Sequence, residues 1–196
     1  MDFFDVVRAR RSVRAFLTKE VDAVALRRLL EAVTRAPSAG DLQAYEVVVV
    51  RHPERRRELA RAAYGQTFVA QAPVVLVFCA HPRRSAGKYG RRGAELYCIQ
   101  DATIAASHAQ LAAVALGLAT VWVGAFDDAA VADLVGGLDP VCIMPVGYPN
   151  EEPEPTPRRS VDELVHLERL PVNPGVGATA RMGRGRPGSD LVRGDP

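Results

Sequence analysis

Several residue types that define common functional classes are scarce in this sequence of 196 residues. The three cysteines, at positions 79, 98 and 142, are far apart and have apolar neighbours. They therefore indicate reduced core residues of a cytoplasmic protein and not a disulfide framework. The four histidines lack the spacing of metal ligands, so we expect no metal site. The formal net charge of +2 is too small for a clustered basic face, which argues against nucleic-acid binding.

Long apolar runs and nucleotide-binding signatures are also absent. No apolar run reaches the length of a membrane span, and the first residues, MDFFDVVRARR, lack the apolar stretch of a signal peptide. The chain has no G-x-G-x-x-G and no G-x-x-x-x-G-K motif. Ser38 is not the centre of a G-x-S-x-G motif. We therefore expect no membrane contact, no single-loop nucleotide site and no nucleophilic catalytic residue.

Most of the chain alternates between helical and strand patterns. Apolar residues at helical spacing predict an amphipathic helix over 23–35, capped by Asp22, and these residues are Leu26, Leu29, Leu30 and Val33. Helical patterns recur at 53–63 and 127–136. Apolar runs predict strands, the first two of them buried on both faces, at 45–50, 72–80, 118–126 and 141–148. This order predicts one domain with a three-layer α/β or α+β core.

The stretch from about 91 to 116 predicts a long helix of unusual composition. It is rich in alanine, and no formally charged residue occurs between 102 and 118. A helix that is apolar all round is buried all round. In so small a protein this favours a second subunit that covers one side, although a central helix of a monomeric core is the alternative.

The character of the chain changes after Tyr148. The segment PNEEPEPTPRR is rich in proline and predicts extended backbone, and SVDELVHLERL predicts one short helix. The remainder, rich in Gly, Pro and Arg, cannot bury enough apolar surface to order itself. We therefore expect a domain over 1–170 and a flexible tail over 171–196.

Four polar loops remain as candidates for a site. They read RRSVR (10–14), PSAGDLQ (37–43), VGAFD (123–127) and PRRS (157–160). Arginine binds phosphate through two parallel donors, and serine adds a third donor. The arginines permit an anion site, but a basic loop taken alone is more often a solvated surface turn than a phosphate site. Composition and spacing do not name the ligand.

The order of six segments along the chain adds information that no single loop carries. These segments are ARRSVRAF, APSAGDLQAYEVVVV, APVVLVFCA, YCIQDATIAASHAQLAAVALGLATVWVGAF, MPVGYP and PRRSVDEL. Together they resemble the nitroreductase family of flavin-dependent oxidoreductases, over residues 3 to about 170. The resemblance implies an α+β homodimer in which a mixed or antiparallel central sheet is flanked by helices. It also implies that FMN is held at the subunit interface, where the long helix packs.

The resemblance assigns the arginines to the charged parts of FMN. Arg10, Ser12 and Arg158 match positions near the phosphate or the ribityl chain, with Arg11 and Arg159 as adjacent candidates. Arg14 matches the family's cationic position near N1 and the C2 carbonyl of the flavin ring. A fixed cation there stabilises the negative charge that two-electron reduction places on these atoms.

Two further segments match flavin contacts of the family. One is the loop contributed by the other subunit, with Pro37, Ser38, Ala39, Asp41 and Gln43. The other is the turn whose backbone amide donates to flavin N5, with Gly124 and Ala125. A small residue at such a turn lets the main chain approach the ring.

The loop departs from the family pattern P-S-x-x-N-x-Q-P-W at three positions. Asp41, Ala44 and Tyr45 replace the asparagine, proline and tryptophan. An ionised carboxylate beside the flavin lowers the flavin potential unless an arginine pairs with it, and we favour the interpretation that Asp41 holds an arginine. Tyr45 and Trp122 are typical of core packing. Tyr89, Tyr97 and Phe68 fit a substrate pocket and helix packing equally.

The activity that the resemblance implies is a ping-pong reaction. NAD(P)H passes hydride to flavin N5, and an electrophilic acceptor such as a nitroaromatic or a quinone then takes the electrons. No side chain is required as acid or base. The alternatives are a flavin-fragmenting enzyme of the same fold, a non-catalytic flavin-binding protein, and a scaffold without a cofactor whose arginines are surface residues.

Overall fold

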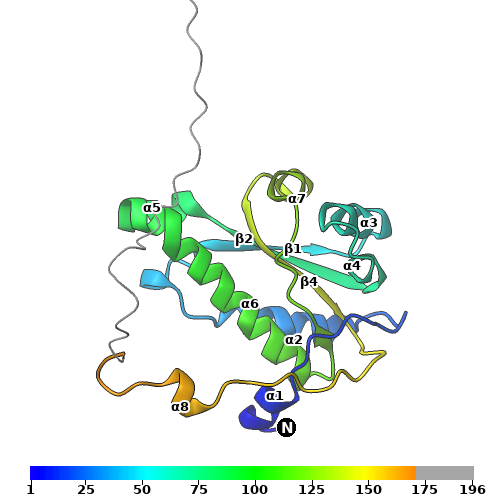
Figure 1. The fold of residues 1–196 in the computed structure, drawn as a ribbon. Coiled ribbons are helices and arrows are strands. Elements are labelled where there is room, and N and C mark those ends of the chain that lie inside the picture. Colours follow the sequence, from blue (N-terminus) through cyan, green and yellow to red (C-terminus); the bar gives the residue numbers. More distant parts are fainter. Residues whose placement is uncertain (171–196) are drawn as a thin grey trace, which may run out of the picture. The chain divides into compact units, whose positions relative to one another are not determined.

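The computed structural model of the chain describes residues 1–170 (Figure 1). The chain divides into two compact units, Met1–Pro155 and Thr156–Pro196, and each is described by itself. The expected flexible tail, 171–196, lies outside the described residues. Within residues 1–170, no helix has the length and apolar character needed to cross a membrane.

The first unit is built on one antiparallel sheet. Its strands are β1 (Tyr45–Val50), β2 (Val74–Ala80), β3 (Ala119–Thr120) and β4 (Asp139–Gly147), in the order β1-β2-β4-β3. Every pairing among these four strands is antiparallel, as the fold expectation allows, and Ser12 adds an isolated parallel bridge to Thr120 of β3. The third strand is much shorter than the expected 118–126. The chain leaves the sheet after Thr120 and returns only as a bridge between Val123 and Ile143.

Helices cover both faces of the sheet. They are α1 (Phe3–Ala9), α2 (Ala23–Thr34), α3 (Pro53–Ala62), α4 (Phe68–Gln71), α5 (Pro82–Arg92), α6 (Cys98–Ala115) and α7 (Asp128–Val135). The second unit contains α8 (Val161–Leu164). The predicted cap of α2 is confirmed, because the Asp22 carboxylate accepts from the amides of Val24 and Ala25 at 2.9 and 3.1 Å.

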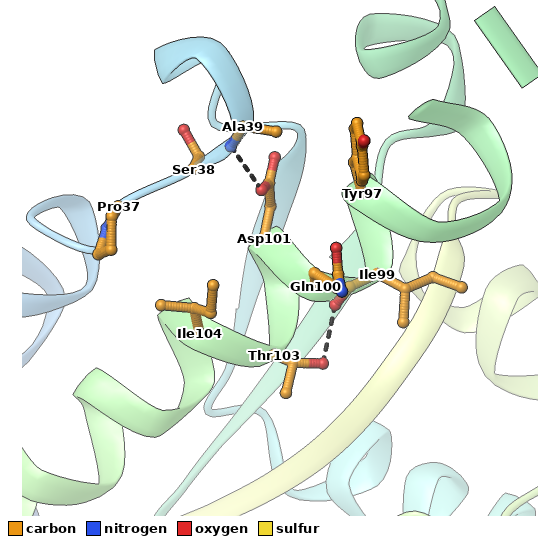
Figure 2. Close-up of a pocket in the computed structure, with 9 residues that line it drawn as sticks. All are labelled: Pro37, Ser38, Ala39, Tyr97, Ile99, Gln100, Asp101, Thr103 and Ile104. Atoms are coloured by element: carbon orange, nitrogen blue, oxygen red, sulfur yellow. Dashed lines mark hydrogen bonds between the residues drawn. The ribbon is translucent and has the colours of Figure 1, made fainter. Parts of the chain in front are cut away.

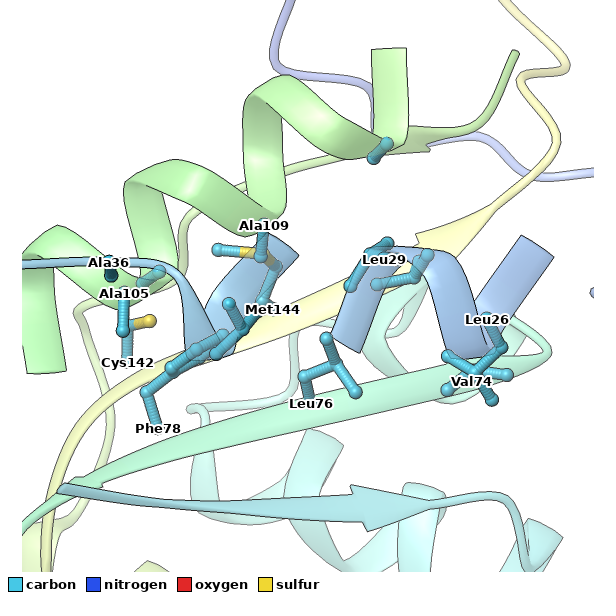
Figure 3. Close-up of a cluster of buried hydrophobic side chains, with 14 of the residues drawn as sticks. Leu26, Leu29, Ala36, Val74, Leu76, Phe78, Ala105, Ala109, Cys142 and Met144 are labelled. Carbon is cyan, nitrogen blue, oxygen red and sulfur yellow. The ribbon is translucent and has the colours of Figure 1, made fainter. Parts of the chain in front are cut away.

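Alternation along β2 divides the core into two clusters. All residues of β2 are buried. Val74, Leu76 and Phe78 pack with α2 and α6 on one face (Figure 3). Val75, Val77 and Cys79 pack with α3, α4 and α7 on the other face. Because successive side chains of a strand point to opposite faces, this is the expected three-layer α+β arrangement.

The apolar sequence of the first strand predicts burial on both faces, and the structure shows that this prediction is wrong. Glu46 is exposed, and the side chain of Val49 is 38% exposed. The reason is position, because β1 is the edge of the sheet and pairs only with β2 among the described strands. Its two ends, Tyr45 and Val50, are buried.

The long helix is present, as predicted from about 91 to 116. A π-helical turn over Gly93–Tyr97 joins α5 to α6, so helical structure runs without a gap through the predicted start and ends at Ala115. Burial is confined to part of its circumference, because Ile99 is 44% and Ile104 37% exposed. A single chain therefore leaves one side of the helix uncovered, which is the side that the expected second subunit would cover.

The cysteines are core residues, as predicted. All three are free and buried. Burial raises the pKa of Cys79 to about 11, and it also raises the pKa of Cys98 and of Cys142. Thiols of this kind are neutral and unreactive near neutral pH. The described residues contain no group of His, Cys, Asp and Glu side chains suited to a metal ion.

Candidate functional site

The arginine-rich segment follows α1 and runs beside β3. Ser12 pairs with Thr120, and the amide of Val13 donates to the Thr120 carbonyl at 3.1 Å. Arg10, Arg11 and Ser12 are half-buried, whereas Arg14 is exposed. The sheet thus fixes the backbone of this segment.

The arginines of this segment differ in what they bind. Arg11 donates to the carbonyls of Arg8 and Arg10 at 2.6 and 2.9 Å, so its guanidinium is tied to the backbone. Within residues 1–170, neither Arg10 nor Arg14 forms an ion pair. The Glu151 carboxylate accepts from the backbone amides of Arg14 and Ala15 and not from a guanidinium.

The turn over Gly124 and Ala125 lies in the same neighbourhood as Arg14. Gln66 donates to the Ala125 carbonyl at 3.1 Å, and the guanidinium of Arg14 lies 6.0 Å from the ring centre of Phe68, two residues after Gln66. Both turn residues are exposed. A Cβ at Gly124 would come within 3.2 Å of Nε1 of Trp122, so glycine keeps this turn uncrowded.

The loop over 37–43 is held by a buried carboxylate that the sequence analysis did not select. Asp101, in the first turn of α6, is 2% exposed. It accepts from the amide of Ala39 at 2.9 Å (Figure 2). It also accepts from the amide of Ala44 at 3.3 Å. The available signal was its position, because Asp101 is the last charged residue before the uncharged stretch.

Further hydrogen bonds fix the same loop from within. The Ser38 hydroxyl accepts from the Gln43 amide at 2.9 Å, and the Gln43 side chain donates to the Thr34 carbonyl at 3.0 Å. Gly40, Asp41 and Gln43 have φ values of 57°, 58° and 45°. Non-glycine residues adopt such angles only where the surroundings impose them. The loop is therefore a defined structure and not a loose connection.

A groove of about 540 Å³ lies between this loop and α6 (Figure 2). Its walls combine apolar and polar side chains, namely Pro37, Ser38, Ala39, Tyr97, Ile99, Gln100, Asp101, Thr103 and Ile104. The volume falls in the range of small-molecule sites.

The predicted site residues of the first unit fall into two groups within one chain. The loop over 37–43 is bonded to Asp101 at the start of α6. Ser12 pairs with Thr120, five residues beyond the helix end at Ala115. Because an α-helix rises 1.5 Å per residue, residues 101 and 115 are about 21 Å apart along the axis. Segments 10–14 and 124–125 therefore lie together, and the loop lies apart from them.

The remaining candidates belong to the second unit. Arg158 donates to the hydroxyl of Thr156, and Arg159 donates to the Glu163 carbonyl at 2.6 Å. Ser160 caps α8 in a capping box with Glu163.

The other residues singled out in the sequence have varied surroundings. Tyr45 is core packing, as predicted, because it is buried and its hydroxyl donates to the Val33 carbonyl at 3.0 Å. Burial raises the pKa of this hydroxyl. Trp122 is half-buried against the core. Asp41 is exposed and has no ion pair within residues 1–170, so a single chain supplies no arginine for it.

The family assignment now has sequence support independent of this geometry. The sequence model of the nitroreductase family matches residues 7–71 and 60–148, which include the arginine segment, the loop and the Gly124–Ala125 turn. The chain therefore belongs to the nitroreductase family, and the resemblance in the sequence is confirmed.

Curated relatives extend over most of the chain. It is 33% identical to an NADH dehydrogenase of Thermus thermophilus over 186 residues, which cover 80% of this chain and 91% of the relative. It is 30% identical to an NADPH-flavin oxidoreductase of Vibrio harveyi, with coverage of 83% and 72%. An FMN reductase of Bacillus subtilis is also 30% identical, with coverage of 81% and 70%.

Solved structures agree on the fold. Nitroreductase A of Vibrio parahaemolyticus superposes with a TM-score of 0.80 at 28% identity, covering 87% of this chain and 77% of that one. The NADPH:FMN oxidoreductase of Vibrio harveyi, solved with NAD+, gives a TM-score of 0.79 at 28% identity, with coverage of 86% and 78%. The fold described above is thus the nitroreductase fold.

Proposed function

We propose that this protein is an NAD(P)H-dependent oxidoreductase that uses FMN and reduces an electrophilic small molecule. The observation that carries the proposal is membership of the nitroreductase family over residues 7–148, together with relatives that are flavin oxidoreductases and FMN reductases. Nitroaromatics and quinones are the acceptor classes that the family resemblance favours. The catalytic chemistry does not require an acid or base from the chain.

The donors of the arginine segment fit a phosphorylated flavin. Arg10 and Arg14 keep their guanidinium groups free of carboxylates within the described chain, and Ser12 adds a hydroxyl beside them. The Oγ1 atom of Thr120, the residue paired with Ser12, is buried and lacks a hydrogen-bond partner within residues 1–170. A set of unpaired donors with few acceptors suits a dianionic ligand. Arg11 is less available, because its guanidinium is bound to the backbone.

Each group of the chain then has a distinct task. When bound, FMN supplies the chemistry of accepting hydride from NAD(P)H and passing electrons to the acceptor. Arg10, Arg158 and Arg159, which the family resemblance assigns to the phosphate end, would neutralise its charge, and the Ser12 hydroxyl would donate a hydrogen bond to it. Arg14 supplies positive charge for the ring edge that becomes anionic on reduction. The exposed Gly124–Ala125 turn offers backbone amides, and its small side chains leave room for a ring.

A homodimer accounts for the separation of the two groups. Residues 10–14 and the loop over 37–43 lie at opposite ends of α6, so one chain cannot bring both to one flavin. The exposed apolar residues supply a surface for a second copy, on α6 (Ile99, Ile104) and α1 (Phe3, Phe4, Val7). In the proposed dimer the loop of one protomer, with Pro37, Ser38, Ala39, Asp41 and Gln43, completes the site of its partner.

A cytoplasmic location completes the proposal. It is supported by the three buried free thiols, since unpaired cysteines are typical of reducing compartments. We also propose that residues 1–170 act together as the FMN-binding domain, because Arg158 and Arg159 are among the assigned phosphate contacts.

The test is an absorbance spectrum of the purified protein followed by anaerobic titration with NADH and with NADPH. We expect a yellow protein whose flavin band bleaches with at least one of them and returns when a quinone or a nitroaromatic is added. A yellow protein that neither nucleotide bleaches would contradict the proposal in favour of a flavin-binding protein without turnover. Colourless protein that takes up no added FMN would indicate a scaffold, and conversion of the flavin to smaller products in air would indicate the fragmenting enzyme.

A further inference from the structure

Helix α5 and the π-helical turn after it concentrate positive charge beside the groove. Between residues 82 and 97 the only carboxylate is Glu95, against five cationic side chains: Arg83, Arg84, Lys88, Arg91 and Arg92. Two of these cations have acidic partners, because Arg84 pairs with Glu46 at 2.5 Å and Arg91 pairs with Glu95 at 2.8 Å. The surplus therefore resides on the other three.

Two of the three remaining cations are packed on tyrosine rings. The Nζ atom of Lys88 lies 5.4 Å from the ring centre of Tyr89. The guanidinium of Arg92 lies 5.4 Å from the ring centre of Tyr97, and its Nε donates to the Tyr97 hydroxyl at 2.9 Å. The two rings meet edge to face, with centres 5.2 Å apart. We call these four residues the tyrosine–cation cluster.

The two cations of the cluster are exposed and free to bind an anion. Within residues 1–170 no carboxylate lies within ion-pair distance of Lys88 or Arg92, and this includes Asp41 on the neighbouring loop. The hydrogen bond to Tyr97 uses one N–H of Arg92 and leaves the other donors of its guanidinium available. Contact with the rings also restricts the two cationic side chains before any anion binds. Binding of an anion therefore costs less conformational entropy.

The cluster borders the groove and touches the loop assigned to the flavin. Tyr97 lines the groove directly, at the end of α6 where Asp101 holds the loop (Figure 2). A Cβ on Gly40 would overlap the Tyr89 hydroxyl and lie 2.5 Å from Nζ of Lys88. Glycine at this position, with φ of 57°, is therefore what lets the loop and the cluster approach each other.

This combination of groups matches the adenosine end of a phosphorylated dinucleotide. A guanidinium and an ammonium bind a phosphate monoester, and tyrosine rings offer faces and edges to a purine. In Rossmann-type sites, which residues 1–170 do not form, a carboxylate binds the ribose 2′-hydroxyl of NAD, whereas an arginine accommodates the 2′-phosphate of NADP. The same charge chemistry applies on any fold. Here the cations are free, while Glu95, the one carboxylate of the segment, is engaged by Arg91.

We infer that Lys88 and Arg92 bind the 2′-phosphate of NADPH at the rim of the groove, and that the protein therefore prefers NADPH to NADH. The inference rests on the proposed function, because it names which nicotinamide nucleotide serves the flavin. It assigns to Tyr89 and Tyr97 the positioning of the two cations and contact with the adenine ring.

The experiment compares two probes that differ only in the 2′-phosphate. Binding of adenosine 2′,5′-bisphosphate and of 5′-AMP is measured by titration calorimetry on the flavin-loaded protein. We expect the bisphosphate to bind about tenfold more tightly, and Lys88→Ala or Arg92→Ala each to remove most of this difference. In steady state, the ratio of kcat/KM for NADPH to that for NADH falls in the same two variants, mainly through KM for NADPH.

The matched control is Arg83→Ala, which removes an exposed cation of the same helix that lies outside the cluster and forms no ion pair within residues 1–170. We expect it to keep the preference for the bisphosphate. Equal binding of the two probes by the unaltered protein would overturn the inference. An equal loss of the preference for the bisphosphate in Arg83→Ala would also overturn it, because it would mean that the overall positive charge of the helix, and not a specific site, attracts the phosphate. If the flavin bleaches with NADH as readily as with NADPH, the inference fails while the proposed function stands. If neither nucleotide bleaches it, the proposed function fails, and the probe titration still decides the phosphate site.

Discussion

The loop over 37–43 and the segment over 10–14 both belong to the proposed flavin site, yet they are stabilised in opposite ways. The loop is held by side chains that bind its own backbone, because Asp101 accepts from Ala39 and Ala44. In the arginine segment the sheet binds the backbone, and the guanidinium groups of Arg10 and Arg14 have no carboxylate partner in the described chain. The comparison teaches that the loop supplies shape, whereas the segment supplies charge.

The largest expected effect comes from removing the loop's anchor. Asp101→Ala leaves two backbone amides unpaired in a buried place, so we expect the free energy of unfolding to fall by about 3 kcal/mol. Urea unfolding of the flavin-free protein measures this loss. Asp101→Asn is the matched control, because it keeps the volume and one acceptor oxygen and should lose about half as much. A change below about 0.5 kcal/mol in Asp101→Ala would show that the loop is shaped without this carboxylate.

Removing a charge from the segment over 10–14 should weaken FMN binding and leave the stability of the fold unchanged. For Arg14→Ala we expect the Kd for FMN to rise about thirtyfold, which corresponds to about 2 kcal/mol for a lost charge-assisted contact. Stability without flavin should change little, since Arg14 is exposed and unpaired in the described residues. Fluorescence titration with FMN measures the Kd, and Arg28→Ala, an exposed arginine of α2, is the control. An equal loss of FMN affinity in Arg14→Ala and Arg28→Ala would contradict the assignment of the charge contact to the segment over 10–14.

The smallest effect concerns the one acidic side chain on the loop. Asp41 is exposed and has no arginine partner within residues 1–170. Asp41→Asn should therefore raise the midpoint potential of the flavin by about 30 mV, equal to about 1.4 kcal/mol for two electrons. Anaerobic spectroelectrochemical titration measures it, with Asp133→Asn on α7 as a control of equal charge. An unchanged or lower potential would indicate that Asp41 is paired with an arginine of the partner or lies away from the flavin.

Caps and apolar periodicity in the sequence predicted which helices and strands form. Contacts between distant residues decided where these helices and strands end and which of their faces are buried. The cap and apolar stripe of α2 lie within a few neighbouring residues, so the sequence revealed both. The π-helical turn was not predicted, and its first residue is in close contact with α5, because a Cβ at Gly93 would lie 2.5 Å from the Ser85 carbonyl oxygen. The exposure of β1 follows from its place at the edge of the sheet, which its own residues do not encode.

The candidate site shows the same division. The arginine segment and the Gly124–Ala125 turn were found from their residue types and from the family resemblance. Asp101 was not, because its bonds reach residues 57 and 62 positions away in the sequence. The sequence did point to Tyr89 and Tyr97 as pocket candidates, but not to their contact with each other and with Lys88 and Arg92, which forms across the turn between α5 and α6.

The distance between the two ends of α6 has a consequence for the protein at low concentration. A lone protomer of the proposed assembly carries the charge for one flavin and the loop for another, and it completes neither. Cofactor retention then depends on mass action between subunits. Dilution should release the yellow chromophore as the protein separates, and added FMN should draw the subunits back together.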